Sequence, residues 1–431
     1  MNEKDLLFQQ VINAKNASKQ MINLTNETKN KILVAIADKI EKNIEDILFR
    51  NGIDIEAGKN ASLSRHFIDR LSLTEERIKD MVEGLRNITK LVDPIGEILD
   101  TNITENGLKI EKKRAPIGVI GIIYEARPNV TIDTIALCIK SGNAIILKGG
   151  SEAMNSNHIL SKLAIEAAEE NGLPIGAIQF IESANRELFA EILNLDKFID
   201  AIIPRGSQEM IEKISEISKI PIIKHGKGLC HIYIDESADI KMAVDIVINA
   251  KTQRPGVCNS LETLLVNRNI AEKFFTEFLK YLTENKVNLE LRACNESFDI
   301  LTKMNKAISP DMKNILMATS EDWDTEYLDM ILAIKIVGNL EEAINHITIH
   351  GSGHSDSIIT ENIENAEKFL KLVDSAAVYH NASTRFTDGG CFGLGAEIGI
   401  STQKLHARGP MGIKELTSYK FVIHGNGQVR K

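Results

Sequence analysis

The N-terminal part of the chain has a helical pattern of apolar and polar positions. From residue 2 to about residue 91, apolar side chains recur at helical spacing and polar side chains separate them. Asn and Asp residues between the runs are typical helix caps. Because no chemically active cluster occurs here, we predict a helical layer that covers another part of the molecule. The recurring apolar positions are Leu6, Leu7, Val11, Ile12, Ile32, Leu33, Ile36, Ile40, Ile44 and Leu48.

The pattern changes at Arg114. Residues 115–124 form a nearly continuous apolar run bounded by Pro and Gly, which is typical of a strand buried on both faces. Helices and further strands then alternate, which predicts parallel βαβ units and a doubly wound sheet. The predicted helices are 132–140 and 155–171, and the predicted strands are 144–148, 178–181, 201–204, 221–223 and 231–234.

The alternation starts again after Cys258 and predicts a second α/β unit. Its strands are expected at 262–266, 332–337, 357–360 and 376–380, and its helices at 270–285, 340–346 and 362–372. The tail, residues 415–423, has the pattern of another strand. A terminal strand after a finished domain often pairs with another segment or subunit. We expect a partner for it in residues 96–109, with which it would make a small flap.

Composition narrows the function classes. The 431 residues are 43% hydrophobic and 26% charged, which is typical of soluble folded proteins. The net charge of −9 argues against nucleic acid or an anionic membrane as a partner. The chain starts without an apolar signal core, and no run of ~18 apolar residues follows. The Cys residues make neither a disulfide framework nor a Cys-x-x-Cys pair, so we expect a cytoplasmic protein. They are Cys138, Cys230, Cys258, Cys294 and Cys391.

Cys258 is the strongest candidate for a nucleophile. It follows the turn signal Arg254-Pro255-Gly256 and precedes polar residues, rather than lying in an apolar run. If a helical turn follows, its N–H groups would favour the thiolate. The alternative is a buried structural thiol, which is the better interpretation of Cys138 and Cys230.

Two turns between a predicted strand and a predicted helix are candidates for binding a dinucleotide. Small residues let a ligand approach the backbone, Lys148 supplies a cation, and the following helix offers N–H donors to an anion. Neither turn is a Gly-x-Gly-x-x-Gly motif, and glycine can also occur in such connections for steric reasons alone. The residues are Lys148, Gly149, Gly150 and Ser151 in the first turn, and Gly206 and Ser207 in the second.

Two polar or Gly-rich loops follow in the second half. His350 and His354 lie close to Asp356, but the Gly-Ser-Gly between the histidines breaks the helix on which a shared metal site would depend. We predict no metal site there and expect a loop at an active-site cleft. Residues 386–397 are rich in glycine and are either a mobile connection or a segment that closes over a site.

The motifs taken together resemble the gamma-glutamyl phosphate reductase family, which belongs to the aldehyde dehydrogenase superfamily. Their order agrees with the family and the resemblance spans about residues 14–429. The motifs are Tyr124-Glu125-Ala126-Arg127-Pro128-Asn129-Val130, Ile203-Pro204-Arg205-Gly206-Ser207, Arg254-Pro255-Gly256-Val257-Cys258-Asn259, residues 337–358 and Gly409-Pro410-Met411-Gly412.

The resemblance implies an activity and roles for particular residues. The reaction would be NADPH-dependent reduction of L-glutamate 5-phosphate to L-glutamate 5-semialdehyde with release of phosphate, a step of proline biosynthesis. Cys258 matches the nucleophile, and Asn129 or a neighbour matches the amide that stabilises the oxyanion. Lys148 and the small residues after it match the region that holds the adenosine ribose. Gly206 and Ser207 match the turn that meets the pyrophosphate.

An aldehyde dehydrogenase-like α/β fold is also implied, with two doubly wound domains and a small β flap for oligomerisation. We therefore expect a homo-oligomer, and an association with glutamate 5-kinase, which makes the acyl phosphate. The expected parts are residues 1–97 and 116–254 for the cofactor-binding domain, 255–380 for the catalytic domain, 98–115 and 413–431 for the flap, and 381–412 for a Gly-rich loop returning to the cofactor-binding domain.

One departure from the superfamily concerns water activation. Hydrolytic aldehyde dehydrogenases have a Glu-Leu-Gly-Gly-Lys motif whose Glu activates water, and here the stretch is Lys224-His225-Gly226-Lys227-Gly228. Because it has no carboxylate, we expect hydride rather than water to resolve a thioester. The rival hypotheses are a hydrolytic aldehyde dehydrogenase and a catalytically silent, metal-binding scaffold.

Three arginines are candidates for binding the phosphate or the α-carboxylate of the substrate, because a guanidinium matches both groups bidentately. They are Arg127, Arg254 and Arg385. The alternative for each is a surface or structural ion pair.

Overall fold

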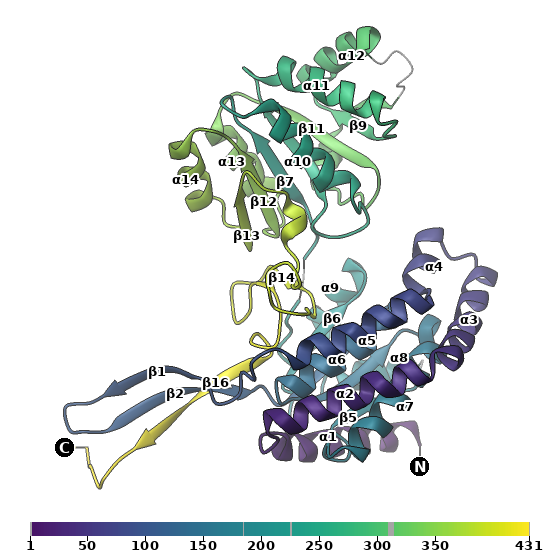
Figure 1. Cartoon of the computed structure of the whole chain (residues 1–431), viewed down its shortest axis with the longest axis vertical. Helices are drawn as coiled ribbons and strands as arrows, with labels where there is room; N and C mark the ends of the chain where they lie inside the picture. The colour runs from purple at the N-terminus through teal and green to yellow at the C-terminus, as the bar shows by residue number, and fades with distance from the viewer. Residues whose placement is uncertain (1, 184, 225, 309–313, 431) are drawn as a thin grey trace. The chain divides into compact units, whose positions relative to one another are not determined.

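The computed structural model describes residues 2–183, 185–224, 226–308 and 314–430. The chain divides into two compact units (Figure 1). The first comprises Met1–His225, Gly393–Gly399 and Leu405–Lys431, and the second Gly226–Phe392 and Ile400–Lys404. Within the described residues, no helix combines the length and the apolar character needed to cross a membrane.

The first unit contains a parallel sheet with the strand order β5-β4-β3-β6. Its strands are β3 (Val119–Tyr124), β4 (Ala144–Gly149), β5 (Ile178–Phe180) and β6 (Ala201–Arg205). The apolar run predicted as one strand over 115–124 is interrupted at Gly118, whose φ of 132° is open to glycine. A Cβ at this position would lie 2.2 Å from Asp200 Oδ2, so the chain passes too close to Asp200 for any side chain.

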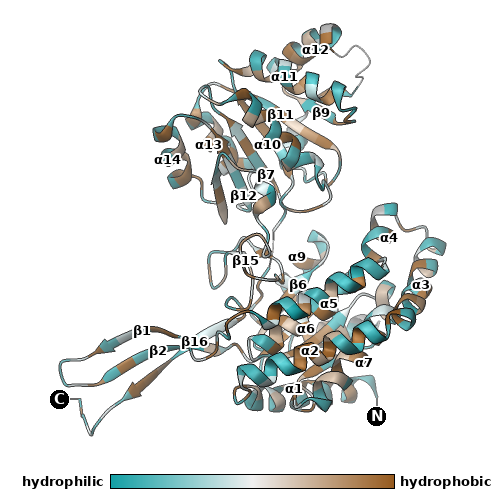
Figure 2. Cartoon of the chain, viewed as in Figure 1, coloured by the Kyte–Doolittle hydropathy of each residue, from teal (hydrophilic) through white to brown (hydrophobic). Residues whose placement is uncertain are grey.

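Helices cover this sheet, and the predicted N-terminal helical layer is confirmed. Helix α1 contacts β3, β4 and β5, and α2, α3 and α5 pack on the helices α6 and α7 that connect the strands. Buried apolar residues at helical spacing form these contacts, so that α2 and α5 carry both brown and teal segments in Figure 2. The helices are α1 (Glu3–Met21), α2 (Asn26–Lys42), α3 (Ile44–Asn60), α4 (Arg65–Leu71), α5 (Glu75–Thr89), α6 (Asn129–Lys140), α7 (Met154–Glu170), α8 (Arg186–Ile192) and α9 (Gln208–Ile217).

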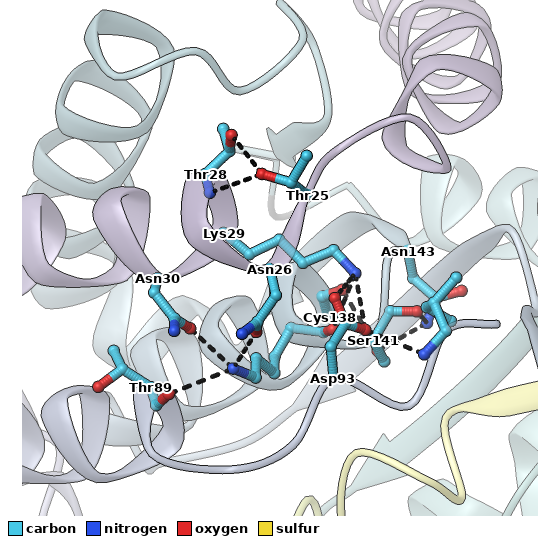
Figure 3. Close-up of polar contacts among 12 residues, drawn as sticks. Thr25, Asn26, Thr28, Lys29, Asn30, Thr89, Asp93, Cys138, Ser141 and Asn143 are labelled. Carbon is cyan, nitrogen blue, oxygen red and sulfur yellow. Dashed lines mark hydrogen bonds and ion pairs between the residues drawn. The ribbon is translucent and has the colours of Figure 1, made fainter. Parts of the chain in front are cut away.

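Two lysines are buried close together where α2 and α6 meet (Figure 3). Lys29 Nζ lies 2.8 Å from Asp93 Oδ2. Lys140 Nζ donates to the side-chain oxygens of Asn26 at 2.8 Å and Asn30 at 2.7 Å. Burial lowers the pKa of Lys140, Asp93 raises it and Lys29 lowers it further. The cluster therefore depends on Asp93 to offset two neighbouring cations.

An antiparallel ribbon formed by β1 (Ile98–Ile103), β2 (Lys109–Pro116) and β16 (Thr417–His424) also belongs to the first unit. The tail strand was expected to pair within residues 96–109, but it pairs with β2, and β1 pairs with the other edge of β2. The ribbon leaves large apolar side chains exposed, which include Tyr419, Phe421 and Ile423 at alternate positions of β16.

The second unit contains a parallel sheet with the strand order β10-β9-β11-β8-β7-β12-β13. The strands are β7 (Cys230–Ile234), β8 (Leu261–Asn267), β9 (Glu290–Ala293), β10 (Ile315–Met317), β11 (Ile331–Val337), β12 (Ser355–Ile359) and β13 (Ala377–His380). The helices are α10 (Ile240–Thr252), α11 (Ala271–Glu284), α12 (Asn295–Ile308), α13 (Leu340–His350) and α14 (Ile363–Leu372). The second unit also contains the 3-10 segments η2 (Ser320–Asp324) and η3 (Thr384–Phe386) and the short strand β14 (Ile400–Ser401). The 3-10 segment η1 (Ser151–Ala153) and the short strand β15 (Gly409–Pro410) belong to the first unit.

Strand β7 corrects the predicted boundary between the domains. We assigned it to the first sheet and ended the cofactor-binding domain at residue 254. The structure places β7 between β8 and β12 of the second sheet, and the second compact unit begins at Gly226. The local pattern of a buried strand is the same in either sheet, so only its pairing partners distinguish the two assignments.

Candidate active site

Cys258 lies in the turn between α10 and β8, at the amino end of a central strand of the second sheet. Its side chain is partly exposed and not in a disulfide. The strand predicted at 262–266 is observed as β8, which begins at Leu261, so no helix follows Cys258. A tight turn precedes the strand instead, with the Ser260 N–H donating to the Val257 carbonyl at 3.0 Å. A helix terminus therefore does not contribute to the environment of the thiol.

The segment before β7 packs directly against the backbone of Cys258. A Cβ on Gly228 would lie 1.9 Å from the Cys258 carbonyl oxygen and 2.5 Å from its Cα, so this contact requires glycine. The buried Cys230 thiol donates to the same carbonyl oxygen at 3.3 Å. Burial, together with nearby acidic groups including Asp356 and Cys258, raises the pKa of Cys230 well above its usual range. Cys230 thus fits the predicted structural thiol. Gly228 and Cys230 together pack against the backbone of the turn that carries Cys258.

The start of the Gly-rich loop holds the residue after Cys258. Asn259 Nδ2 donates to the Thr387 carbonyl at 2.9 Å, and Thr384 Oγ1 donates to the Asn259 carbonyl at 2.8 Å. Asp388 Oδ1 accepts from the Gly390 N–H at 2.9 Å, which closes a small turn. The loop is therefore connected, at its N-terminal end, to the turn that carries Cys258.

Two of the three candidate arginines lie near the Cys258 turn. Arg385 Nε donates to Gln253 Oε1 at 2.9 Å. Burial lowers the pKa of Arg385, and the charge of Arg254 lowers it further, whereas Asp388 and Cys258 raise it. The structure thus brings Arg254, Arg385 and Cys258 into one electrostatic neighbourhood of the second unit.

The two histidines of the polar loop have different surroundings. His350 ends α13 and its Nδ1 lies 2.9 Å from Asp324 Oδ1. His354 is buried, with Nδ1 2.8 Å from Ser355 Oγ and 3.7 Å from Cys230 Sγ. In the parts of the chain that the structure describes, His, Cys, Asp and Glu form no group able to hold a metal ion.

The candidate cofactor residues lie at the carboxyl ends of adjacent strands in the first sheet. The chain proceeds outward from β3 to β4 and β5, and then returns to place β6 on the other side of β3. Ligands of open α/β sheets bind at such a switch point, outside the carboxyl ends of the strands. The residues that follow β3, β4 and β6 include Asn129, Gly150, Ser151, Gly206 and Ser207.

Lys148 and Gly149 end β4. Lys148 Nζ donates to the Gly149 carbonyl at 2.9 Å, and burial lowers the pKa of Lys148 while Glu152 raises it. A Cβ on Gly149 would meet Asn157 Nδ2 at 2.2 Å, so this strand end is packed against α7. The Lys148 ammonium therefore lies at the strand end.

Asn129 and Arg127 occupy the connection from β3 to α6. Asn129 is the first residue of α6, and its Nδ2 donates to Asp133 Oδ2 at 2.9 Å. Burial raises the pKa of Asp133 to about 6, although Asn129 and Arg205 oppose this shift. Arg127 is partly buried. These residues belong to the first unit and Cys258 to the second, so the oxyanion role of Asn129 stays a prediction.

Comparison with known proteins identifies the family. The model of the aldehyde dehydrogenase family matches residues 4–299. A gamma-glutamyl phosphate reductase from Clostridium tetani is 52% identical over 97% of this chain and 97% of its own length. The chain belongs to the gamma-glutamyl phosphate reductase family of aldehyde dehydrogenases.

Other members of this reductase family agree with the assignment. The gamma-glutamyl phosphate reductase of Caldanaerobacter subterraneus subsp. tengcongensis is 53% identical over 97% of this chain and 98% of its own length. The crystal structure of the gamma-glutamyl phosphate reductase from Thermotoga maritima has a TM-score of 0.91, with 46% identity over 99% of this chain and 100% of that chain. The predicted aldehyde dehydrogenase-like fold is confirmed.

Sequence reasoning assigned no role to several acidic residues of this reductase fold. Glu125 and Glu152 lie within or beside motifs that we singled out, and each accepts a backbone N–H: Ser207 at 2.8 Å and Ala126 at 2.7 Å, respectively. The sequence offered one indication for each residue. Glu125 directly follows a predicted strand, and Glu152 follows the candidate cofactor residues that begin with Lys148. Neither contact could be derived from that position alone.

Glu326 had no local signal. Its Oε1 accepts from the Gly228 N–H at 2.9 Å, although 98 positions separate the two residues. The stretch 224–228 has no carboxylate of its own, and His225 within it lies outside the described residues. The tertiary structure nevertheless places the Glu326 carboxylate against this stretch. The lack of a carboxylate within residues 224–228 is therefore not sufficient by itself to predict that hydride rather than water resolves a thioester.

Proposed function

We propose that this chain catalyses the NADPH-dependent reduction of L-glutamate 5-phosphate to L-glutamate 5-semialdehyde with release of phosphate. It would act as an oxidoreductase in proline biosynthesis. The observation that carries the proposal is the identity of about half of all positions with gamma-glutamyl phosphate reductases over nearly the whole chain. A partly exposed Cys258 on a braced turn is the chemical feature that supports it.

Cys258 is the proposed nucleophile. Its thiolate attacks the acyl phosphate carbonyl, a C–S bond forms, and the C–O bond to phosphate breaks, so that phosphate leaves with the bonding pair. The thioester that results is reduced at its carbonyl carbon, and collapse of the thiohemiacetal releases aldehyde and regenerates the thiolate. Covalent catalysis of this kind divides one difficult step into two easier ones.

The tetrahedral intermediates need hydrogen-bond donors where negative charge develops. We assign this role to the Cys258 backbone N–H and to the side-chain amide of Asn129. Removal of one such donor typically costs ~3 kcal/mol of transition-state stabilisation. Asn129 Nδ2 donates to Asp133 Oδ2 at 2.9 Å. This hydrogen bond would either hold the amide in position for the oxyanion or compete with the oxyanion for the amide N–H.

Arg385, Arg254 and Arg127 are the proposed ligands of the phosphate and the α-carboxylate. The support is strongest for Arg385, because it is partly buried and its side chain is oriented by Gln253 close to Arg254. Two adjacent guanidinium groups repel each other, and an anion between them would relieve that repulsion.

Membership of the aldehyde dehydrogenase family implies a nicotinamide cofactor, which supplies the hydride when bound. We propose NADPH rather than NADH, because the reaction is biosynthetic and because Lys148 offers a cation. The residues fit a dinucleotide, because Gly206 adds no side chain to the turn before α9 and Ser207 is the N-cap of that helix, where backbone N–H groups can meet a phosphate. Lys148, Gly149, Gly150 and Ser151 would hold the adenosine ribose and Gly206 and Ser207 the pyrophosphate.

We further propose a homo-oligomer that assembles through the β1-β2-β16 ribbon. The exposed apolar side chains of β16 support this proposal, because a contiguous apolar strand face in water is typical of an interface. We also propose a cytoplasmic location. An association with glutamate 5-kinase is proposed because a labile acyl phosphate favours transfer between neighbouring enzymes.

The decisive assay follows phosphate-dependent reduction of NADP with glutamate 5-semialdehyde, which is the reverse reaction. We expect activity in the wild type and in Cys294→Ala, a matched control in which another partly exposed thiol is removed. Cys258→Ala should lose at least about a thousand-fold in kcat. Near wild-type activity in Cys258→Ala would exclude covalent catalysis there. Equal rates with and without phosphate, with free glutamate as the product, would favour a hydrolytic aldehyde dehydrogenase instead.

A further inference from the structure

The N-terminus of α9 is engaged by a carboxylate from another strand connection. Ser207 is the N-cap of this ten-residue helix, and its backbone N–H donates to Glu125 Oε2 at 2.8 Å. Glu125 directly follows β3, and Ser207 follows β6 by two positions. Because β3 and β6 are neighbours at the switch point of the sheet, the two turns lie side by side.

The backbone of this junction keeps Glu125 in place. The Glu125 N–H donates to the Arg205 carbonyl at 2.9 Å, which extends the pairing of β3 with β6 by one residue. Gly206 leaves open the space that the carboxylate fills, because a Cβ there would lie 2.5 Å from Glu125 Oε2 and 2.9 Å from its Cδ. The missing side chain at position 206 and the carboxylate of Glu125 therefore fit each other.

A carboxylate and a phosphate compete for such a position. The free N–H groups and the positive end of a helix dipole favour one anion at a helix N-terminus. A second anion at van der Waals distance from the first would experience direct repulsion. A dinucleotide whose pyrophosphate reaches Ser207 and Gly206 therefore meets Glu125 at the same N–H group.

We infer that Glu125 occupies the pyrophosphate position of the cofactor site when no dinucleotide is bound, and that the dinucleotide must displace it. Glu125 then lowers the affinity of the enzyme for its cofactor, because the Glu125–Ser207 contact must break before the dinucleotide can bind. The inference rests on the proposed function, since it takes the site to be one for a nicotinamide dinucleotide. It predicts weaker binding and faster release of NADP and NADPH than the turn would otherwise allow.

The test measures binding of NADPH to the full-length protein by isothermal titration calorimetry. Glu125→Gln keeps the size of the side chain and removes its charge, and Glu125→Ala removes the contact entirely. We expect NADPH to bind about 5-fold more tightly to Glu125→Gln than to the wild type. Glu212→Gln is the matched control, because it removes a carboxylate that lies further along α9 and contacts Gln208 rather than Ser207. Its affinity for NADPH should equal that of the wild type.

A second probe separates the pyrophosphate from the rest of the cofactor. Adenosine 2′-phosphate carries the adenosine and the 2′-phosphate of NADPH but no phosphate at the 5′ position, and its affinity should be the same in the wild type and in Glu125→Gln. Thermal melting of each variant without ligand establishes that it is folded. Glu125→Ala gives an independent measurement should Glu125→Gln melt early.

The outcomes distinguish a failure of the Glu125 inference from a failure of the proposed function. If the wild type binds NADPH and the Glu125 variants bind it equally well or more weakly, Glu125 is a brace of the turn, and the inference is wrong while the proposed function stands. If adenosine 2′-phosphate gains affinity as much as NADPH does, the effect is general electrostatics, and the displacement mechanism is also wrong. If the wild type binds no nicotinamide dinucleotide, the proposed function fails and the inference fails with it.

Discussion

Gly228→Ala should reduce the catalytic activity that depends on Cys258 while leaving the protein folded. The Cβ that this substitution adds would lie 1.9 Å from the Cys258 carbonyl oxygen and 2.5 Å from the Cys258 Cα. Both are backbone atoms, so rotation of a side chain cannot relieve the overlap. The turn that carries Cys258 must move by about 1 Å to restore an ordinary contact distance, because a close-packed interior leaves no free space for the added atom.

The expected effect on the reaction is large. A displacement of about 1 Å at the reacting group typically costs about 100-fold in rate. Overpacking a tight contact costs about 1–3 kcal/mol of stability, which a chain with two large cores should tolerate. We therefore expect kcat to fall about 100-fold in Gly228→Ala, while the protein stays folded at assay temperature.

The assay measures kcat and KM for phosphate-dependent NADP reduction, with thermal melting in parallel. Gly52→Ala is the matched control, because a Cβ at this exposed position of α3 would meet nothing within 4 Å. It should keep full activity and gain about 0.5–1 kcal/mol of stability, as Ala does relative to Gly inside a helix. Wild-type kcat in Gly228→Ala would refute the argument that the position of the Cys258 turn depends on this glycine.

Three further predictions concern charge and pH. Arg385→Lys keeps the charge but loses the planar fork, so kcat/KM for the semialdehyde and phosphate should fall about 10-fold in steady-state assays; an unchanged value would exclude Arg385 as an anion ligand. Burial lowers the pKa of His346 to about 2, so the unfolded state alone takes up this proton between about pH 6.5 and 2. Stability should therefore fall with decreasing pH over that range by up to about 1.4 kcal/mol per unit, and denaturant titrations should show a shallower fall in His346→Gln. Asp93→Asn leaves the buried Lys29 and Lys140 without their carboxylate, and denaturant unfolding should show a loss of about 3 kcal/mol, whereas no loss would exclude an electrostatic role for this cluster.

Local patterns were sufficient for most of the fold. Strands buried on both faces, such as Val119–Tyr124, are short apolar runs, and helices such as Glu75–Thr89 have apolar residues at helical spacing. Both signals depend on residues within one element, so a sequence displays them directly. Strands β9 and β10 were not predicted, because they are very short and their apolar runs are correspondingly brief. The 14-residue helix α12 between them was also not predicted, and its length does not explain that omission.

The candidate site was only partly accessible in the same way. Cys258 could be singled out because a turn signal lies next to it in the sequence, and the Gly206-Ser207 turn because it follows a recognisable strand. The strand after Cys258 could also be predicted, whereas the turn signal alone left open whether a helical turn would precede that strand. Glu326 could not be found at all, because its partner Gly228 is distant in the sequence.

The sequence by itself therefore determined the two α/β units, the terminal strand and the family, all of which are encoded in local periodicity and in ordered motifs. Only the tertiary structure decided that β7 joins the second sheet, that Gly228 packs against the Cys258 backbone and that the Glu125 carboxylate lies at the start of α9. The physical reason is common to all three. Parallel pairing and side-chain contacts join segments that are far apart along the chain, and periodicity within one segment carries no information about its partner.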